Sequence, residues 1–348
     1  MFNITINGIY PKHPEPPRPR PLEKVLDDYE LNLIEDKVLE KALERAVVDA
    51  VGEMIAGGVE MVSDGLIRRY EPNVCIFSRL SGTQITSNQQ HNGSRSVSVR
   101  VTDKIRWKEP LAVNEYSFIA ERSPVSVRPV LTGPFSLLEN CDLGVYAERP
   151  TSLVTDISIA LNKELRELKK AGAEWILIEE PNLHNFKEDT EFILETYSIL
   201  LDGVFPSIML GTHCEDIAFL VDILPKTQWN GIAINLVNSN ANYDLIQKNL
   251  IQRDLTIQLG LIDAECEVIE DASLIAEKLL FLSQFHDPNR LWIAPNKGFA
   301  VLNRDVIYKK LLVMSSAVNI ARKESARQEQ PGGELTDDKD QDDVGPEV

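Results

Sequence analysis

A group of polar residues in the second half of the chain has the composition of a metal site or a proton-transfer site. His213, Cys214, Glu215 and Asp216 follow directly on the apolar run 208–212. Imidazole, thiolate and carboxylate groups are the ligands that zinc takes in proteins, and the same groups can move protons. Polar residues also end many buried strands, so the rest of the chain has to show which role these residues have.

Comparable polar residues end most of the other apolar runs of the chain. They are Asp64, Arg68, Arg69, Thr132, Glu179, Glu180, Asn235, Asp263, Glu265, Asn296 and Lys297. A single polar residue at such a place often does no more than begin the next helix, as Asp216 and Asp271 could do. A set contributed by nearly every run indicates a functional site.

The elements that must position these residues alternate regularly between strand and helix. Apolar runs typical of buried parallel strands occupy residues 2–9, 59–64, 127–133, 175–180, 207–213, 231–237, 256–263 and 291–296. Helical patterns occupy residues 36–56, 151–171, 185–201, 214–224, 242–253, 271–285 and 304–321. Eight strands with intervening helices predict an α/β fold of the (β/α)8 TIM-barrel type, whose active sites lie at the carboxyl ends of the strands. A doubly wound open sheet is the alternative, but no G-x-G-x-x-G follows an early strand.

Two segments depart from this alternation. Within an insertion at about residues 81–116, residues 94–101 alternate strictly, and 104–107 continue the pattern after the turn-like Thr102-Asp103. This predicts an antiparallel hairpin, expected to lie over one barrel mouth. The last residues, 323–348, are acidic and almost without large apolar side chains, so we expect a disordered tail after one barrel domain at 1–322.

Composition narrows the classes of function. The net charge of −18 argues against binding to nucleic acid or to an anionic membrane. No run of eighteen apolar residues could span a bilayer, and the first residues do not resemble a secretion signal. Four cysteines without a CxxC pair suggest reduced thiols, so we expect a cytoplasmic protein.

The residues at the strand ends resemble, in their order and their sequence motifs, those of the catalytic domain of cobalamin-independent methionine synthase, particularly its short single-domain form. The resemblance runs from about residue 4 to residue 321. Its motifs are Gly8-Ile9-Tyr10-Pro11 (GSYP in the family), 62–69 (DGE-x-RR), Leu131-Thr132-Gly133-Pro134 (TGP), 171–181 (ending in DEP), Thr212-His213-Cys214 (THxC) and 290–298 (RLWVNPDCG). The resemblance implies transfer of a methyl group from a methyltetrahydrofolate-type donor to the thiol of homocysteine. It also implies a zinc ion, held by His, Cys, Glu and Cys, that keeps this thiol as a thiolate.

Several positions depart from that family pattern. Cys214 follows His213 directly, so the two side chains of an extended chain point apart. Asn235 stands where the family has a zinc-binding Glu, and Lys297 stands where it has the last Cys. Substitutions at the acceptor are Leu66, for the Glu that holds the amino group of homocysteine, and Glu265, for a histidine that could donate a proton.

Two interpretations of the metal site stay open. A zinc site rebuilt from His213, Cys214, Glu265 and Cys266 is one of them. In the other, Lys297 binds an anionic substrate or acts as a base, or only forms a salt bridge to Glu180 or Asp263.

Three functions remain open at this point. The first is a methionine-synthase-like methyltransferase acting on small molecules, the second a metal-free lyase or decarboxylase of the same superfamily, and the third a non-catalytic barrel kept for binding. Oligomeric state is open, with a homodimer as one option. The selected residues are Asp263, Glu265 and Lys297 as catalytic, Asp64, Arg68, Arg69, Thr132, Glu179, Glu180, Asn235 and Asn296 as substrate-binding, and His213 and Cys214 as metal ligands.

Overall fold

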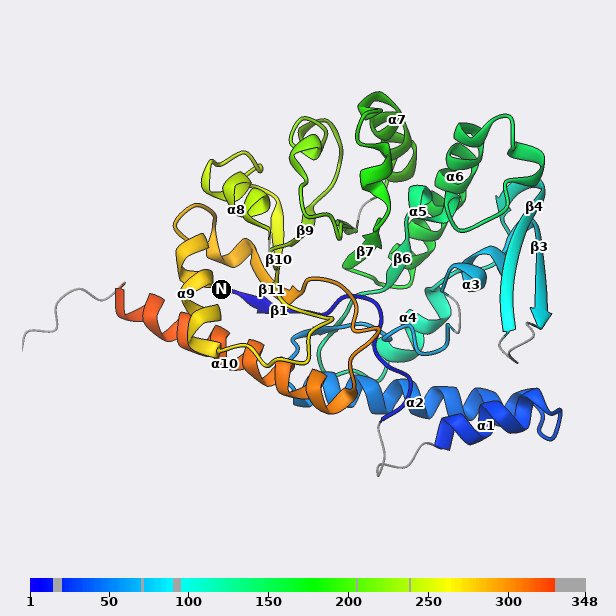
Figure 1. Ribbon diagram of the computed structural model, residues 1–348, viewed down its shortest axis with the longest axis horizontal. Coiled ribbons are helices and arrows are strands. Elements are labelled where there is room, and N and C mark those ends of the chain that lie inside the picture. The colour runs from blue at the N-terminus through cyan, green and yellow to red at the C-terminus, as the bar shows by residue number, and fades with distance from the viewer. Residues whose placement is uncertain (15–20, 70–71, 90–94, 205, 238, 329–348) are drawn as a thin grey trace, which may run out of the picture.

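The computed structural model has a ring of short parallel strands with helices around it (Figure 1), and it describes residues 1–14, 21–69, 72–89, 95–204, 206–237 and 239–328. Within these residues one parallel sheet has the strand order β1-β11-β10-β9-β8-β7-β6. A second parallel pair joins β2 to β5. The strands are β1 (Asn3–Ile4), β2 (Met61–Val62), β5 (Ser126–Val127), β6 (Val130–Thr132), β7 (Trp175–Glu179), β8 (Ser207–Gly211), β9 (Gly231–Asn235), β10 (Thr256–Ile262) and β11 (Leu291–Pro295).

Contacts around β2 close this ring. Thr5, just after β1, forms a parallel bridge with Met61 of β2. The N–H of Arg128, just after β5, donates to the carbonyl of Val62 at 2.8 Å, and β6 begins two residues later. β5 and β6 are therefore two halves of one strand, interrupted at Pro129, which cannot donate a ladder hydrogen bond. The eight predicted strands are confirmed, each shorter than its apolar run, and they form a TIM barrel.

Alternation along the strands divides the core into two parts. One small cluster fills the inside of the barrel, and its members are Leu66, Val130, Leu177, Met209, Ala233 and Trp292. The neighbouring residues on the same strands, such as Ile176, Ile178 and Ile234, belong to the large cluster that includes the helices. Successive side chains of a strand point to opposite faces, so a nearly continuous apolar run serves both parts of the core.

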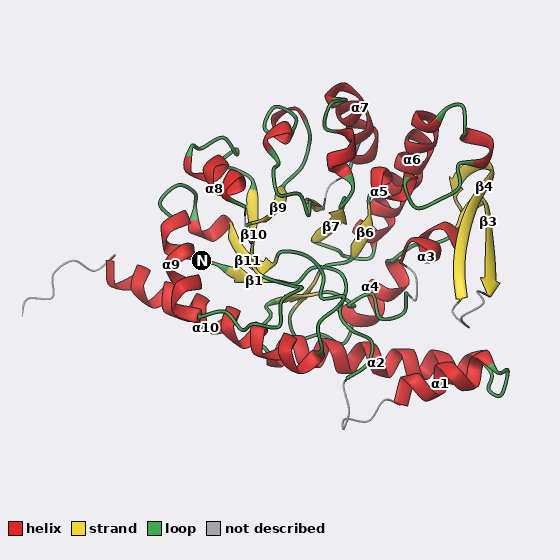
Figure 2. Ribbon diagram, in the orientation of Figure 1, coloured by secondary structure: helices red, strands yellow, loops and turns green. Residues whose placement is uncertain are grey.

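The helices cover the outside of the barrel (Figure 2), and most of the predicted helices are confirmed. Their bounds are α1 (Pro21–Glu30), α2 (Asp36–Ala56), α3 (Pro72–Ser78), α4 (Val113–Ala120), α5 (Pro134–Leu138), α6 (Pro150–Lys170), α7 (Thr190–Leu201), α8 (Asn240–Gln247), α9 (Ala272–Leu282) and α10 (Arg304–Gln328). Helices α1, α3, α4 and α5 were not predicted from the sequence. Among the described residues no helix is both long enough and apolar enough to cross a membrane.

The predicted helix at 214–224 is wrong, because only two short 3-10 turns form there. The carboxylate of Asp216 accepts the N–H of Ala218, and the amide oxygen of Asn242 accepts the N–H of Ile217. The Asp216 contact forms a local turn, and the Asn242 contact ties this segment to α8, so the backbone follows short turns instead of one continuous helix. The disordered tail predicted from residue 323 is also wrong at its start, since α10 continues to Gln328. Residues 329–348 lie outside the described residues.

The insertion forms an antiparallel hairpin, but the two predicted arms, 94–101 and 104–107, are wrong, because from Arg95 on both belong to one strand. Strands β3 (Leu80–Gln89) and β4 (Arg95–Trp107) pair antiparallel, and β4 runs through Thr102-Asp103 without a turn. The register shifts there instead, opposite Gly82, where a Cβ would lie 2.6 Å from the carbonyl oxygen of Asp103. The hairpin does not lie over the barrel mouth. It packs on the outside beside α6 and α3 (Figure 1), where the indole N–H of Trp107 donates to Glu164 of α6 at 2.8 Å.

Candidate active site

Four ionisable side chains gather at the carboxyl ends of β7, β8, β10 and β11. They are Glu179, His213, Glu265 and Lys297, called here the mouth cluster. The imidazole Nε2 of His213 lies 3.9 Å from the Glu179 carboxylate, and the ammonium of Lys297 lies 2.6 Å from the Glu265 carboxylate. The two pairs are near neighbours, because Glu179, Lys297 and Glu265 all act electrostatically on His213.

Glu179 is the last residue of β7 and connects the mouth cluster to the first strand. One of its carboxylate oxygens accepts the backbone N–H of Gly8 at 3.2 Å, and its side chain is 14% exposed. A Cβ on Gly8 would lie 3.0 Å from the other oxygen, so the glycine lets the backbone approach the carboxylate. Thr132 of β6 is the register partner of Glu179 and shares its face of the sheet. Glu179 and Thr132 keep their places as candidate substrate-binding residues.

His213 and Cys214 do not face the same space, as their adjacency predicts. The pKa of His213 is lowered by burial, against the opposing effect of Glu179, and this keeps its imidazole neutral at pH 7. The Cys214 side chain is buried among the large apolar cluster outside the barrel. Burial raises the pKa of its thiol, while the backbone N–H of His184 acts in the opposite direction. A buried thiol of this kind is unreactive, and it is turned away from His213.

Lys297 pairs with Glu265, another of the selected residues, and not with either of the partners predicted for it. Its predicted salt bridge to Glu180 or Asp263 is not formed, and Glu265 takes that place. Asp263 is engaged within its own loop, where one carboxylate oxygen accepts the N–H groups of Glu265 and Cys266. Asp263 therefore shapes the loop that presents Glu265, and Glu265 and Lys297 are the predicted catalytic residues with exposed charged groups.

Glu180 differs from its neighbour Glu179 in burial and in the groups that its carboxylate contacts. Its carboxylate is fully buried and accepts the N–H groups of Phe135 and Ser136 at 3.1 and 2.8 Å, at the start of α5. Burial raises its pKa to about 7, although these donors act against the shift. A Cβ on Gly133 would lie 2.3 Å from this carboxyl group. The predicted role of Glu180 in substrate binding is therefore not supported, because it holds α5 against the barrel.

Asn235 and Asn296 act in the same way as Asp263. The side-chain oxygen of Asn235 accepts the N–H of Val237 at 3.0 Å, and that of Asn296 accepts the N–H of Ala264 at 3.0 Å. Both asparagines thus hold the loops that follow the strands. Their predicted contacts with substrate are not supported, because their side-chain oxygens already bind backbone N–H groups.

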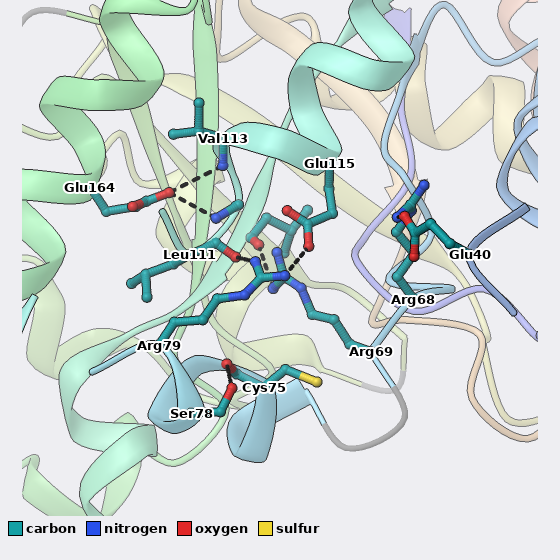
Figure 3. Close-up of polar contacts among 12 residues, drawn as sticks. Glu40, Arg68, Arg69, Cys75, Ser78, Arg79, Leu111, Val113, Glu115 and Glu164 are labelled. Carbon is teal, nitrogen blue, oxygen red and sulfur yellow. Dashed lines mark hydrogen bonds and ion pairs between the residues drawn. The ribbon is translucent and has the colours of Figure 1, made fainter. Parts of the chain in front are cut away.

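A second group of charged residues lies near the end of β2, and Figure 3 shows three of its members, Arg69, Arg79 and Glu115. It comprises Asp64, Arg69, Arg79 and Glu115, called here the β2 cluster. Arg79 donates to the Glu115 carboxylate at 2.6 Å and to the carbonyl of Leu111 at 2.5 Å, and Arg69 donates to the carbonyl of Val130 at 3.1 Å. Asp64, Arg69 and Glu115 are almost fully buried, and burial raises the pKa of Asp64.

Arg68 turns away from both clusters. It pairs with Glu40 and Glu44 on α2 and lies over the ring of Phe118, 5.1 Å from its centroid (Figure 3). Its predicted contact with substrate is not supported, because its guanidinium faces the outer helix.

A buried arginine inside the barrel was missed by reasoning from the sequence. Arg128 is 1% exposed and donates to the carbonyl of Ile6 at 3.0 Å, to the side-chain oxygen of Gln258 at 2.8 Å and to the thioether of Met209. Gln258 in turn donates to Asn7 at 2.6 Å. Burial lowers the pKa of Arg128 to about 10, and the negative charge of Glu179 opposes that shift. The sequence signal for this residue was a single basic side chain within the otherwise apolar run 127–133.

The residues present do not fit the zinc ion that the family resemblance implies. No group of three or more His, Cys, Asp or Glu side chains that could hold a metal occurs in the described part of the chain. Among the described residues, Glu179 is the one carboxylate within 4.0 Å of the His213 imidazole. Cys214 is turned away, and the amide oxygen of Asn235 is engaged with its own loop. The ammonium of Lys297 would repel a dication at the same mouth.

Comparison with known proteins identifies a family. The profile of the family described as "Cobalamin-independent synthase, N-terminal domain" matches residues 99–283, more than half of the chain. Proteins named methionine synthase match nearly the whole chain. The one from Sulfurisphaera tokodaii is 27% identical over 326 residues, which are 93% of this chain and 94% of that protein. The one from Thermococcus kodakarensis is 25% identical and covers 94% of this chain and 96% of its own length.

A solved structure agrees in fold. The B12-independent methionine synthase from Shewanella sp. W3-18-1, in complex with selenomethionine, superposes with a TM-score of 0.79 over 94% of this chain and 99% of that one. Its sequence is 19% identical, so this likeness shows the fold alone.

Proposed function

Because this chain belongs to the cobalamin-independent synthase family, we propose that it is a methyltransferase that forms methionine from homocysteine and a methyltetrahydrofolate-type donor. The observation that carries this proposal is the match, along almost the full length of both chains, to relatives named methionine synthase. Its substrates would both be small molecules. The whole barrel at 1–322, rather than one segment of it, would then be the catalytic unit.

The mouth cluster supports a binding mode for an amino-acid acceptor. Glu179 presents a carboxylate beside the N–H of Gly8, and a carboxylate of this kind can bind the ammonium group of homocysteine. The family's second acidic residue for this group is replaced by Leu66, which is buried in the inner barrel cluster. Glu179 would therefore bind the amino group without help from that position.

Methyl transfer also requires a path for one proton. A sulfur–carbon bond forms, the nitrogen–carbon bond of the donor breaks, and the thiol proton has to reach the nitrogen that loses the methyl group. His213 is neutral at pH 7 and lies at the mouth, so it can accept the thiol proton as a general base. Glu179, 3.9 Å away, would favour the imidazolium that forms.

Product analysis tests the proposal directly. Purified protein would be incubated with homocysteine and methyltetrahydrofolate, in the monoglutamate and triglutamate forms, and methionine would be measured by mass spectrometry. We expect methionine in wild type and a loss of at least about tenfold in Glu179→Gln, because an ion pair with the substrate becomes a neutral contact. The matched control is Glu174→Gln, one residue before the same strand. The absence of methionine with either donor, from a folded protein, would reject the proposal.

A further inference from the structure

The exposed cation of the mouth, Lys297, is held only by a weak partner. Its ammonium contacts Glu265 at 2.6 Å, and the two side chains are 31% and 61% exposed. Ion pairs that reach solvent in this way contribute only about 0–1 kcal/mol, so opening this one is inexpensive. A negatively charged group entering the mouth could therefore replace the carboxylate of Glu265.

A second positive charge lies inside the barrel, below Glu179. The hydrogen bonds of Arg128 all go to neutral acceptors, and its buried Nε has no hydrogen-bond partner among the described residues. No carboxylate contacts Arg128 among the described residues, and its charge interacts electrostatically with Glu179 of the mouth cluster. Two positive side chains thus act on the mouth, Lys297 at its rim and Arg128 from the barrel interior.

At this mouth the ligands expected for a dication are missing or turned away. We infer that the acceptor binds to this mouth as an anion, directly against the ammonium of Lys297 and without a divalent metal, and that Glu265 occupies the place of that anion in the free protein. This inference rests on the proposed function, since it concerns the same acceptor. The anionic group is the thiolate or the carboxylate of the amino acid, and both would be recognised by the same ammonium.

Binding measurements separate this arrangement from a metal site. Protein dialysed against EDTA would be titrated with homocysteine by calorimetry, before and after addition of zinc, and its metal content would be measured by mass spectrometry. We expect little zinc and the same affinity in both titrations. Stoichiometric zinc that is lost in His213→Ala, together with binding only in its presence, would overturn the inference.

Two neutralising substitutions have opposite expected effects. Lys297→Gln should lower the affinity about tenfold or more, because a charge-assisted contact is lost, and Lys297→Arg should retain most of it. Glu265→Gln should raise the affinity a few-fold, because a competing anion is removed. If Glu265→Gln weakens binding as much as Lys297→Gln does, Glu265 only orients Lys297 and the inference is wrong. Equal affinity in wild type and Lys297→Gln would also refute it.

The control and the ligand series complete the test. Lys248→Gln removes an exposed lysine that is paired to Asp244 at 2.7 Å, and it should change nothing. Methionine has the carboxylate but no thiol, whereas 3-aminopropanethiol has the thiol but no carboxylate. The ligand whose affinity falls in Lys297→Gln identifies the group bound by Lys297, and an effect on neither would overturn the inference.

The proposed function and this inference fail in different ways. A wild-type protein that binds no homocysteine and forms no methionine would reject both. A wild-type protein that forms methionine and requires zinc to bind homocysteine would leave the proposed function standing and reject the metal-free site.

Discussion

Two groups of charged residues lie at strand ends of the same barrel, and they differ in how completely the fold engages them. In the β2 cluster, Glu115 is 5% exposed and Arg79 donates both to it and to a backbone carbonyl. In the mouth cluster, Glu265 is 61% exposed and Lys297 has this one ion pair among the described residues. A charge that is buried and hydrogen-bonded is costly to remove, whereas a charge at the surface is available to a ligand. Burial and hydrogen bonding of a charged group, rather than its residue type, distinguish structural from functional charges in this protein.

The largest effect that we expect comes from breaking the β2 cluster. Glu115→Ala leaves Arg79 without its carboxylate and removes a negative charge that acts on the buried Arg69. The free energy of unfolding should therefore fall by about 3 kcal/mol, measured by urea denaturation. Glu109→Ala, in the same segment, removes an exposed carboxylate paired to Lys108 and should cost less than about 0.5 kcal/mol. Equal costs for the two variants would contradict the distinction between the clusters.

The second effect concerns Glu180, whose pKa of about 7 lies above its ordinary value of 4.5 because of burial. Between these values the folded state keeps the proton that the unfolded state releases. Stability from this group is therefore present below about pH 4.5 and is lost as the pH rises to about 7. The free energy of unfolding of wild type relative to Glu180→Gln should fall by roughly 3 kcal/mol over this window. A difference independent of pH would mean that Glu180 stays ionised when folded.

A substitution at Gly133 tests the same boundary between barrel and helix α5. Gly133→Ala places a Cβ 2.3 Å from the carboxyl carbon of Glu180 and should cost about 1–3 kcal/mol in stability. The control substitution should change the stability in the opposite direction. Gly52→Ala, inside α2 where a Cβ meets no atom within 4 Å, should stabilise by about 0.5–1 kcal/mol. Chemical denaturation of both variants measures the contrast, and a harmless Gly133→Ala would show that Glu180 is not fixed.

The smallest effect should come from the mouth cluster. Lys297→Gln and Glu265→Gln should each change the free energy of unfolding by less than about 1 kcal/mol, because their ion pair reaches solvent. The same denaturation experiment applies. A loss comparable to that of Glu115→Ala would assign the mouth cluster a structural role and remove the contrast with the β2 cluster.

Most of the fold could be predicted from the sequence because the spacing of apolar residues differs between strands and helices. All eight strands and the bounds of α2 followed from that pattern. It failed at 214–224, where Asp216 and Asn242 capture backbone donors, and at the hairpin, where Thr102-Asp103 forms an irregular pairing instead of a turn. The contact of Asp216 with Ala218 is local, but the contact of Asn242 with Ile217 and the close approach of Gly82 to Asp103 join residues that a local pattern does not compare.

Of the site, the sequence by itself determined where the polar residues gather, because parallel strands bring their carboxyl ends to one face of a barrel. It also determined that His213 and Cys214 point apart, because side chains alternate. Only the tertiary structure decided that Glu179 faces the mouth while Glu180 is buried under α5, and that Lys297 pairs with Glu265. These outcomes depend on which groups from distant segments reach each carboxylate and exclude water from it. The spacing of residues along one chain contains no measure of that.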